Sequence, residues 1–246
     1  MPNKMLFIGG MGRSGTHYLG RIIGEHPQVR LRLEAKFTFW SITNHVAYNK
    51  KTNAVRFWLA AIFLKVLSSS SPRIVCEKTH PVIWVKSKLD RIFPKAKWIC
   101  VRRDPYQSIA SMKEHRGVQK WYNQIPLNEI NPFLGITKEN KSRFQELSLV
   151  EKGAYKWIAH MEQMKRIEHD SPKRVMTVEF DNLVTNQKET LTAVFNFLHL
   201  DPILPNEKGD QSSLAKKNNL TKEESLLISQ ILISNNWGEW TKFSPF

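Results

Sequence analysis

The chain has 246 residues, of which 41% are hydrophobic and 24% are charged, and its formal net charge is +15 at pH 7. This length and composition suit a globular protein with one sizeable core and exclude a disordered or fibrous chain. The excess of cations indicates anionic partners, but charge alone does not distinguish nucleic acid, anionic lipid and a polyanionic small molecule.

The sequence predicts an α/β fold, because β-rich and helical patterns alternate along the chain. The apolar run at 5–9 predicts a strand that leads into a glycine turn, and β-rich runs bounded by turn signals follow at 73–76, 97–101 and 174–179. Amphipathic patterns predict helices over residues 14–25, 54–67, 83–92, 106–114, 147–169, 182–198 and 222–234. We expect a single domain over residues 1–246, with a central, mostly parallel sheet flanked by helices.

The most apolar predicted helix, over 54–67, bears on membrane contact. It is shorter than the roughly 20 residues that a bilayer-spanning helix needs, and Arg56 and Lys65 interrupt it. We therefore expect no transmembrane segment. The helix is predicted to be buried or interfacial, which leaves peripheral contact with a membrane open. No signal peptide is recognisable ahead of the first strand, so we expect a cytoplasmic protein.

Two other stretches interrupt the regular pattern. Ser68–Pro72 indicates a flexible connector, and periodicity fades between residues 117 and 146. A long segment of the second kind predicts a lid or a wall of an acceptor site. The two cysteines, Cys76 and Cys100, have no second Cys or His at zinc-ligand spacing, and we expect them to be buried, reduced thiols.

The glycine turn after the first strand has the layout of an anion-binding loop. The segment GMGRSGTH, Gly10 to His17, lies between a strand and a helix start, where backbone N–H groups and the helix dipole attract an anion. A nucleoside-triphosphate loop would have lysine and a magnesium-binding hydroxyl where this chain has Thr16 and His17. The positive charge is displaced to Arg13. The loop therefore disfavours a magnesium-dependent nucleotide kinase or hydrolase.

A second phosphate motif is predicted in FPKAKWICVRRDPYQSIASM, residues 93–112. Arg103 follows the predicted strand, and Ser111 lies eight residues further on, two turns into the next helix. The planar guanidinium of Arg103 suits a phosphate, and the hydroxyl of Ser111 can face the same anion. The alternative is a structural ion pair between Arg103 and a carboxylate at the sheet edge.

These two motifs, together with VEFDNLV at 178–184, resemble those of sulfotransferases that use 3′-phosphoadenosine 5′-phosphosulfate (PAPS). The resemblance spans most of the chain. It implies a P-loop-like α/β fold, PAPS as the sulfuryl donor, 3′-phosphoadenosine 5′-phosphate (PAP) as the product, and no metal. It also implies that the loop holds the 5′-phosphosulfate and the second motif the 3′-phosphate. The binding residues so implied are Arg13, Ser14, Gly15, Thr16, His17, Arg103 and Ser111.

The chain departs from the family pattern in a few places. His17 stands where a second Thr is common, and Phe180 stands where Tyr is frequent. Asparagines precede the C-terminal WGEW, where soluble members of the family have an Arg-Lys-Gly run. Whether Lys216 and Lys217 supply the missing phosphate contact is open at this point.

The resemblance also implies catalytic residues. In-line sulfuryl transfer needs cations at the leaving oxygen and a base at the acceptor hydroxyl. Arg13 and Lys78, which ends a predicted strand, are the implied cations. Two residues compete for the base. Glu34, in EHPQVRLRLEAKF, resembles the base of tyrosylprotein and heparan-type sulfotransferases, whereas His80, in KTH, matches the base of phenol and steroid sulfotransferases. We prefer Glu34, because its distance from the loop arginine equals that in the tyrosylprotein enzymes.

We therefore expect metal-free transfer of a sulfuryl group from PAPS to a hydroxyl of a glycan, a glycolipid or a peptidyl tyrosine. The alternative acceptor is a small phenol, alcohol or lipid, with His80 as the base. A nucleic-acid or anion-binding module is a third class, but the chain carries no helix-turn-helix, zinc-finger or aromatic RNA-binding signature. The oligomeric state stays open.

Overall fold

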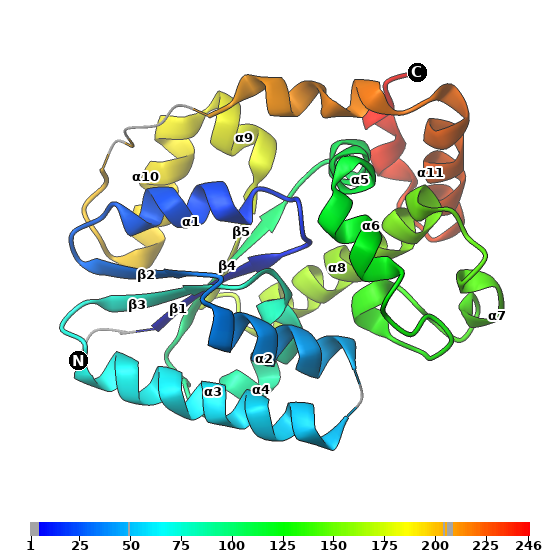
Figure 1. The fold of residues 1–246 in the computed structure, drawn as a ribbon. Helices are drawn as coiled ribbons and strands as arrows, with labels where there is room; N and C mark the ends of the chain where they lie inside the picture. The colour runs from blue at the N-terminus through cyan, green and yellow to red at the C-terminus, as the bar shows by residue number, and fades with distance from the viewer. Residues whose placement is uncertain (1–4, 49, 204, 206–208) are drawn as a thin grey trace.

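The structure, a computed structural model, describes residues 5–48, 50–203, 205 and 209–246. At its centre lies a five-stranded sheet in the order β2-β3-β1-β4-β5, and each neighbouring pair of strands is parallel. The strands are β1 (Met5–Gly10), β2 (Val29–Leu33), β3 (Ile74–Lys78), β4 (Lys97–Arg102) and β5 (Val175–Glu179). The predicted α/β fold, with a parallel central sheet flanked by helices, is confirmed (Figure 1).

Helices cover both faces of the sheet (Figure 1). One face carries α1 (Thr16–Gly24), α9 (Phe180–Thr185) and α10 (Gln187–Leu198). The other carries α3 (Lys51–Ser70), α4 (Lys86–Leu89), α5 (Pro105–Glu114), α8 (Leu149–Asp170) and α11 (Lys222–Ser234). Helix α2 (Lys36–Ala47) packs on α3, and α6 (Arg116–Tyr122) and α7 (Lys141–Phe144) follow α5. The short 3₁₀ helices are η1 (His80–Val85), η2 (Pro132–Leu134), η3 (Gln211–Asn219) and η4 (Gly238–Phe243).

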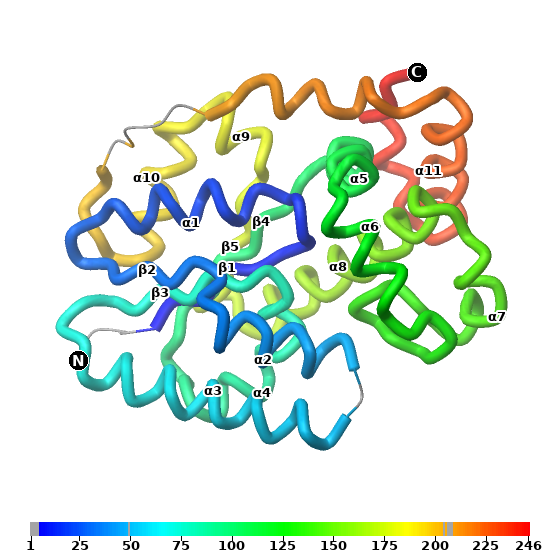
Figure 2. The backbone as a smooth tube through the Cα atoms, in the orientation of Figure 1, coloured from blue at the N-terminus to red at the C-terminus, as the bar shows by residue number. Residues whose placement is uncertain are grey.

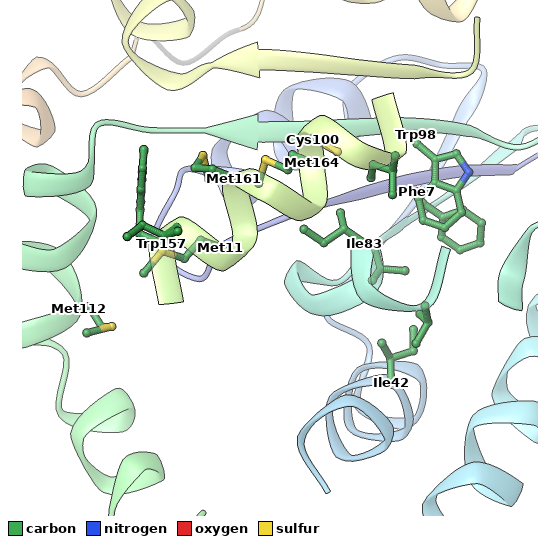
Figure 3. Close-up of a cluster of buried hydrophobic side chains, with 14 of the residues drawn as sticks. Phe7, Met11, Ile42, Ile83, Trp98, Cys100, Met112, Trp157, Met161 and Met164 are labelled. Atoms are coloured by element: carbon green, nitrogen blue, oxygen red, sulfur yellow. The ribbon is translucent and has the colours of Figure 1, made fainter. Parts of the chain in front are cut away.

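The side chains of β1 divide the core into two layers, because successive residues of a strand point to opposite faces. Leu6 and Ile8 pack in the layer beneath α1 and α10. Phe7 packs on the other face against Trp98 of β4, with the ring centroids 4.4 Å apart. Figure 3 shows this second layer, which extends along α8 to Trp157. All of β1 is buried, as expected of the central strand of a parallel sheet.

The strands predicted from the sequence match β1, β3, β4 and β5 to within two residues at each end. The strand β2 was not predicted, because the sequence VRLRL interrupts its apolar residues with Arg30 and Arg32. This alternation is typical of a strand at the edge of a sheet, where β2 lies. The helix α2 was not predicted either. Its sequence KFTFWSITNHVA is rich in residues of low helix propensity, and the helix is stabilised by packing on α3 and η1.

Three predicted boundaries are wrong. The connector predicted at Ser68–Pro72 begins inside α3, whose last turn includes Ser68 and Ser70, and the hydroxyls of both donate to carbonyls of that helix. The helix predicted over 83–92 is the 3₁₀ helix η1 followed by the short α4. The helix predicted over 182–198 is interrupted at Asn186, whose backbone leaves the helical region at φ −122° and ψ 49°.

In the described ranges, no helix has the length and apolar character needed to cross a membrane. Both cysteines, Cys76 and Cys100, are buried and free, as predicted. Burial raises the pKa of the Cys100 thiol to about 12.

The carboxyl ends of the parallel strands meet at one edge of the sheet. The glycine loop follows β1, Glu34 follows β2, His80 follows β3 after one residue, and Arg103 follows β4. Helix α5, which carries Ser111 of the second predicted motif, lies beside the loop between β1 and α1 along the chain path in Figure 2. In open parallel sheets, ligands bind in the crevice at this edge.

Candidate active site

The glycine loop turns tightly between β1 and α1. The amide of Ser14 donates to the carbonyl of Met11 at 3.2 Å, and both Arg13 and Gly15 adopt positive φ angles, 75° and 93°. Helix α1 begins at Thr16 without a side-chain cap. The amides of its first turn have no intrahelical acceptor and carry the positive end of the helix dipole. The loop therefore presents uncapped N–H donors at the sheet edge, which is the geometry of an anion site.

The hydroxyl of Ser14 also supports the interpretation of this loop as an anion site. Ser14 is 1% exposed, and among the described residues its Oγ has no hydrogen-bond partner. A buried hydroxyl without a partner is costly, and a bound anion would satisfy it. Thr16 is also buried and lines the same crevice. These loop residues fit the phosphosulfate group that the sequence predicts for them.

The second motif meets the loop across the crevice. The Nε of Arg13 donates to the Oγ of Ser111 at 3.2 Å, and an Nη of Arg103 donates to the carbonyl of Arg13 at 3.1 Å. The structure thus brings together two predicted phosphate-binding segments that lie about ninety residues apart in the sequence. Helix α5 is fixed there by Asp104, whose carboxylate caps its first turn.

Arg103 is buried without a carboxylate partner among the described residues. Its other hydrogen bonds go to the side-chain oxygen of Gln107 at 3.0 Å and to the carbonyl of Ser213 in η3. Burial lowers the pKa of the guanidinium to about 10, so it stays charged at neutral pH. Among the residues that the structure describes, no carboxylate forms the ion pair that was the alternative interpretation of Arg103, although the charges of Asp181 and Asp104 partly oppose the fall in its pKa. A buried cation whose hydrogen-bond partners are neutral is suited to bind a phosphate.

Phe180 lies beneath the loop, where related enzymes often have Tyr. The guanidinium of Arg103 lies 4.3 Å from the centroid of its ring, so the aromatic face supports the cation. A Cβ atom at Gly15 would lie 2.1 Å from the ring of Phe180. Gly15 is therefore required both by its positive φ and by this close approach.

Glu34 and Lys78 meet because β2 and β3 are neighbours. Leu33 pairs with Lys78 in the parallel register, so Glu34 emerges beside the end of β3, and its amide donates to the carbonyl of Lys78 at 2.9 Å. Glu34 adopts a positive φ of 46°, which is rare for a residue with a side chain. Such strained backbone occurs at functional sites, and here it sets the direction of the carboxylate.

The two candidate bases form one hydrogen-bonded cluster with the lysine. Lys78 Nζ donates to Glu34 Oε1 at 2.6 Å and to His17 Nδ1 at 2.7 Å. The Nδ1 of His80 lies 3.1 Å from the same Glu34 oxygen, and we place its proton there because a carboxylate only accepts. Glu34, His80 and Lys78 therefore form one hydrogen-bonded unit.

The pKa shifts describe this cluster at neutral pH. Burial alone would raise the pKa of Glu34, but the hydrogen bond from His80 and the charge of Lys78 hold that pKa at about 2. Burial lowers the pKa of Lys78 to about 8, although the charge of Glu34 opposes the shift. Burial also lowers the pKa of His80 to about 4. The cluster therefore contains a carboxylate, an ammonium and a neutral imidazole.

A buried carboxylate beneath this cluster was not predicted. Glu77 of β3 accepts hydrogen bonds from Thr38 of α2 at 2.6 Å, from Thr79 at 2.9 Å and from Arg32 of β2 at 2.9 Å. It therefore ties β2, β3 and α2 together below the functional side chains. The EK pair at 77–78 was visible in the sequence, but both residues are buried, and only their hydrogen-bond partners distinguish the structural role of Glu77 from the predicted site role of Lys78.

A pocket of about 620 Å³ opens in front of this cluster. Arg13, His17, Glu34, Lys78 and His80 contribute to its floor. Helix α2 forms one wall, and the predicted acceptor segment forms another, through Gly117, Val118, Lys120, Trp121 and Gln124. This volume is within the usual range for small-molecule sites. A larger hollow of about 760 Å³ between α6 and α8 contains none of the predicted site residues.

Lys156 of α8 lines the same pocket and was not predicted. Its Nζ lies 4.7 Å from the ring centroid of Trp121 and 4.8 Å from that of Phe133, and the described residues provide no carboxylate within ion-pair distance of it. Burial lowers the pKa of the ammonium to about 7. The sequence offers no signal for it, because a lysine in an amphipathic helix is usually solvated.

Lys217 is one of the two lysines considered for the missing phosphate contact. Lys217 of η3 donates to the carbonyl of Phe243 at 3.1 Å, so it is engaged with the C-terminal segment. Elsewhere in η3, the carbonyl of Ser213 accepts a hydrogen bond from Arg103 of the second predicted motif. Among the described residues, no group of three or more His, Cys, Asp or Glu side chains could hold a metal ion.

Comparison with known families identifies the chain. The family described as "Sulfotransferase family" matches residues 6–203, and the chain therefore belongs to the sulfotransferase family. A curated Caenorhabditis briggsae protein named "Putative protein-tyrosine sulfotransferase" is 23% identical over 209 residues, which cover 80% of this chain. The match spans 66% of that relative, slightly less than two thirds of its length.

Solved sulfotransferase structures share the fold. The sulfotransferase domain of the Synechococcus PCC 7002 olefin synthase has a TM-score of 0.61 at 14% identity, with 95% of this chain and 94% of that chain covered. A sulfotransferase from Alicyclobacillus acidocaldarius has a TM-score of 0.55 at 15% identity, with 98% of each chain covered. The match over residues 6–203 confirms the predicted family of enzyme, and these structures confirm the predicted fold. The donor, the acceptor, the base and the individual site residues stay predictions.

Proposed function

We propose that the protein transfers a sulfuryl group from PAPS to an acceptor hydroxyl, and that the crevice at the carboxyl edge of the sheet is its active site. One observation carries the proposal. In the described part of the chain, a buried arginine without a carboxylate partner, a buried hydroxyl without a hydrogen bond and an uncapped helix N-terminus all converge on this crevice. A bound anion would stabilise each of these three features, and PAPS carries two suitable anionic groups, its 3′-phosphate and its 5′-phosphosulfate.

The nucleotide would be held by both motifs. Arg103 and Ser111 suit the 3′-phosphate, and the loop from Arg13 to His17 suits the 5′-phosphosulfate. Because Arg13 is hydrogen-bonded to Ser111, the two proposed subsites are directly connected. The guanidinium of Arg13 and the ammonium of Lys78 then stabilise the charge that develops on the leaving oxygen, and the loop amides stabilise the sulfuryl oxygens.

Glu34 is the base in this proposal. Its carboxylate lines the acceptor pocket, and the hydrogen bond from His80 holds it in place. Its low pKa arises partly from the ion pair with Lys78. When the leaving oxygen draws the ammonium of Lys78 away, the pKa of Glu34 rises and the carboxylate becomes a better acceptor for the hydroxyl proton.

The acceptor would enter the pocket between α2 and the segment 117–146. Phe39, Trp40 and Trp121 provide aromatic walls, which suit a sugar or a phenol ring. The curated relative from Caenorhabditis briggsae is named for protein-tyrosine sulfation, which supports a peptidyl tyrosine beside a glycan or glycolipid hydroxyl as the acceptor class. A small phenol with His80 as the base is the alternative.

Turnover of two matched variants tests this assignment. The assay is transfer from radiolabelled PAPS to a tyrosine-containing acidic peptide, desulfated heparan sulfate, p-nitrophenol and galactosylceramide in vesicles. Glu34→Gln is expected to lower kcat by ~10²–10⁴-fold, because a general base contributes about that much, while the binding of PAP changes little. His80→Asn keeps a donor towards Glu34 and is expected to have a smaller effect.

The opposite order of effects would assign the base to His80. If His80→Asn abolishes turnover and Glu34→Gln hardly changes it, the proposed base is wrong. If the wild type transfers sulfuryl to none of these acceptors and also fails to bind PAP, the proposed function itself is wrong.

A further inference from the structure

The outer side of α3 carries a stripe of large apolar side chains that no part of the described chain covers. Six residues of this helix are 36–64% exposed. They are Val55, Trp58, Leu59, Ile62, Phe63 and Val66. Two residues of α2, Phe37 and Trp40, are about half exposed beside them. We call these eight residues the α2–α3 apolar face.

Helix geometry separates this stripe from the core. At about 100° per residue, the exposed residues of α3 point away from the side that packs into the core. The buried side is formed by Phe57, Ala60, Ala61 and Leu64. A surface helix normally has polar residues on its outer side, and a contiguous exposed apolar patch marks an interaction site.

Cations flank the apolar stripe, and acids are absent from this part of the sequence. Arg56 and Lys65 border the stripe on opposite sides of α3, and Lys36 and Lys51 are exposed at the helix starts. No Asp or Glu occurs between Glu34 and Glu77, a stretch that contains both helices. The face therefore combines an apolar centre with a positively charged border, and neither α2 nor α3 contains an acidic residue.

This combination fits the surface of an anionic lipid bilayer. Interfacial helices lie in the membrane plane with Trp, Phe and Leu in the acyl boundary and Lys or Arg at the headgroups. Helix α3 has 20 residues and spans about 30 Å, which is ample for a helix lying flat. A second copy of the chain would oppose this border with the same positive charges, which disfavours self-association through this face.

The apolar face continues to the mouth of the catalytic pocket. Phe37 contacts Phe63 edge to face at 5.8 Å and so connects α2 with α3. On the next turn of α2, Trp40 lies at the lip of the pocket and packs on Phe39, whose ring lies 5.6 Å from that of His80. A bilayer seated on this face would lie against the pocket mouth.

We propose that the α2–α3 apolar face docks the protein on anionic lipid bilayers and that its acceptor hydroxyl is carried by a membrane lipid. The docking part of this proposal depends only on the α2–α3 apolar face and its charged border. The second half rests on the proposed function, because it requires that this pocket sulfates a hydroxyl. Of the acceptor classes proposed above, this part of the proposal favours the hydroxyl of a glycolipid headgroup.

Vesicle co-sedimentation tests the docking. The full chain is expected to bind vesicles of phosphatidylcholine with phosphatidylglycerol and to bind pure phosphatidylcholine vesicles at least tenfold more weakly. The variant Leu59→Ser/Ile62→Ser/Val66→Ser is expected to lose binding by tenfold or more, because it removes the apolar centre of the face. Lys51→Gln/Arg56→Gln is expected to weaken only the anionic component, on the order of tenfold.

A matched control distinguishes the face from general surface hydrophobicity. Leu226 and Ile233 of α11 are 58% and 61% exposed, and Leu226→Ser/Ile233→Ser is expected to bind vesicles like the wild type. If the wild type does not bind anionic vesicles, or if both serine variants lose binding equally, the docking proposal is overturned. Sedimentation velocity adds a further outcome. A wild-type dimer that becomes a monomer in the α3 variant would assign the face to a second copy.

Transfer assays test separately whether the acceptor hydroxyl is carried by a membrane lipid. The α3 variant is expected to transfer sulfuryl to p-nitrophenol at the wild-type rate but to lose transfer to galactosylceramide in anionic vesicles, and its binding of PAP is expected to be unchanged. Vesicle binding without any transfer to the glycolipid would overturn the acceptor and leave the docking intact. Failure of the wild type to bind PAP would instead overturn the proposed function.

Discussion

Lys156 carries a buried ammonium group, and its protonation makes the free energy of unfolding depend on pH. Burial lowers its pKa from 10.5 to about 7, so between these pH values the unfolded chain binds more protons than the folded one. The free energy of unfolding therefore rises with pH across this window, and the penalty of the buried charge is complete below pH 7. The side chain is held among aromatic rings and has no carboxylate partner in the described structure to offset that penalty.

Replacing this lysine should change the pH dependence of stability. Lys156→Met is expected to raise Tm at pH 6, by roughly 2–4 °C for each kcal/mol of penalty removed, and to flatten the rise in Tm from pH 7 to pH 9. Thermal unfolding at the three pH values measures this. The control is Lys141→Met, which removes an exposed lysine of α7. A variant at position 156 with the wild-type slope would show that the buried ammonium does not cause it.

At the same scale, the sequence could propose most residues of the candidate site but not their electrostatics. Arg13, Arg103 and Ser111 could be proposed from motif spacing, and the structure brings all three into contact. Glu34 and His80 were treated as competing bases, yet they share one hydrogen bond. Their contact depends on the pairing of β2 with β3, and a strand that was not predicted could not position Glu34.

At the scale of elements, the loop between β1 and α1 depends on Gly15. Alanine there is expected to be strained, because left-handed backbone costs a residue with a Cβ about 1–2 kcal/mol and the Cβ would also collide with Phe180. Gly15→Ala should lower Tm and abolish PAP binding. Calorimetric titration and thermal unfolding measure both effects.

Gly12→Ala is the matched control within the same loop. A Cβ at Gly12 would lie 3.7 Å from the nearest atom of His80, which is an ordinary contact. We expect a stable variant with PAP affinity close to that of the wild type. Equal losses for the two alanine variants would mean that the backbone of Gly15 is not what shapes the loop.

The elements missed by the sequence analysis share a physical cause. Strand β2 has arginines at alternate positions, and α2 is rich in aromatic and β-branched residues, so local pattern and propensity are weak in both. Their stability comes from tertiary contacts, including the buried carboxylate of Glu77 that accepts hydrogen bonds from both elements. Elements with strong local patterns, such as β1 and the long α8, were predicted well.

At the scale of the whole molecule, the topology creates the site. Five parallel strands direct their carboxyl ends to one edge, and residues at or just beyond these ends supply both the groups proposed to bind phosphate and the proposed catalytic cluster. The single domain over residues 1–246 and the cytoplasmic location predicted from the sequence stay predictions. The central claim is that this edge binds the nucleotide of PAPS.

Calorimetric titration with PAP in the presence of a metal chelator, beside ADP, tests that claim most directly. The account predicts metal-free binding of PAP that is stronger than that of ADP by roughly 10–100-fold, because charged hydrogen bonds to the 3′-phosphate contribute about 1.5–3 kcal/mol. Arg103→Gln should remove this preference. Equal binding of PAP and ADP, binding that requires magnesium, or no binding of PAP would contradict the account.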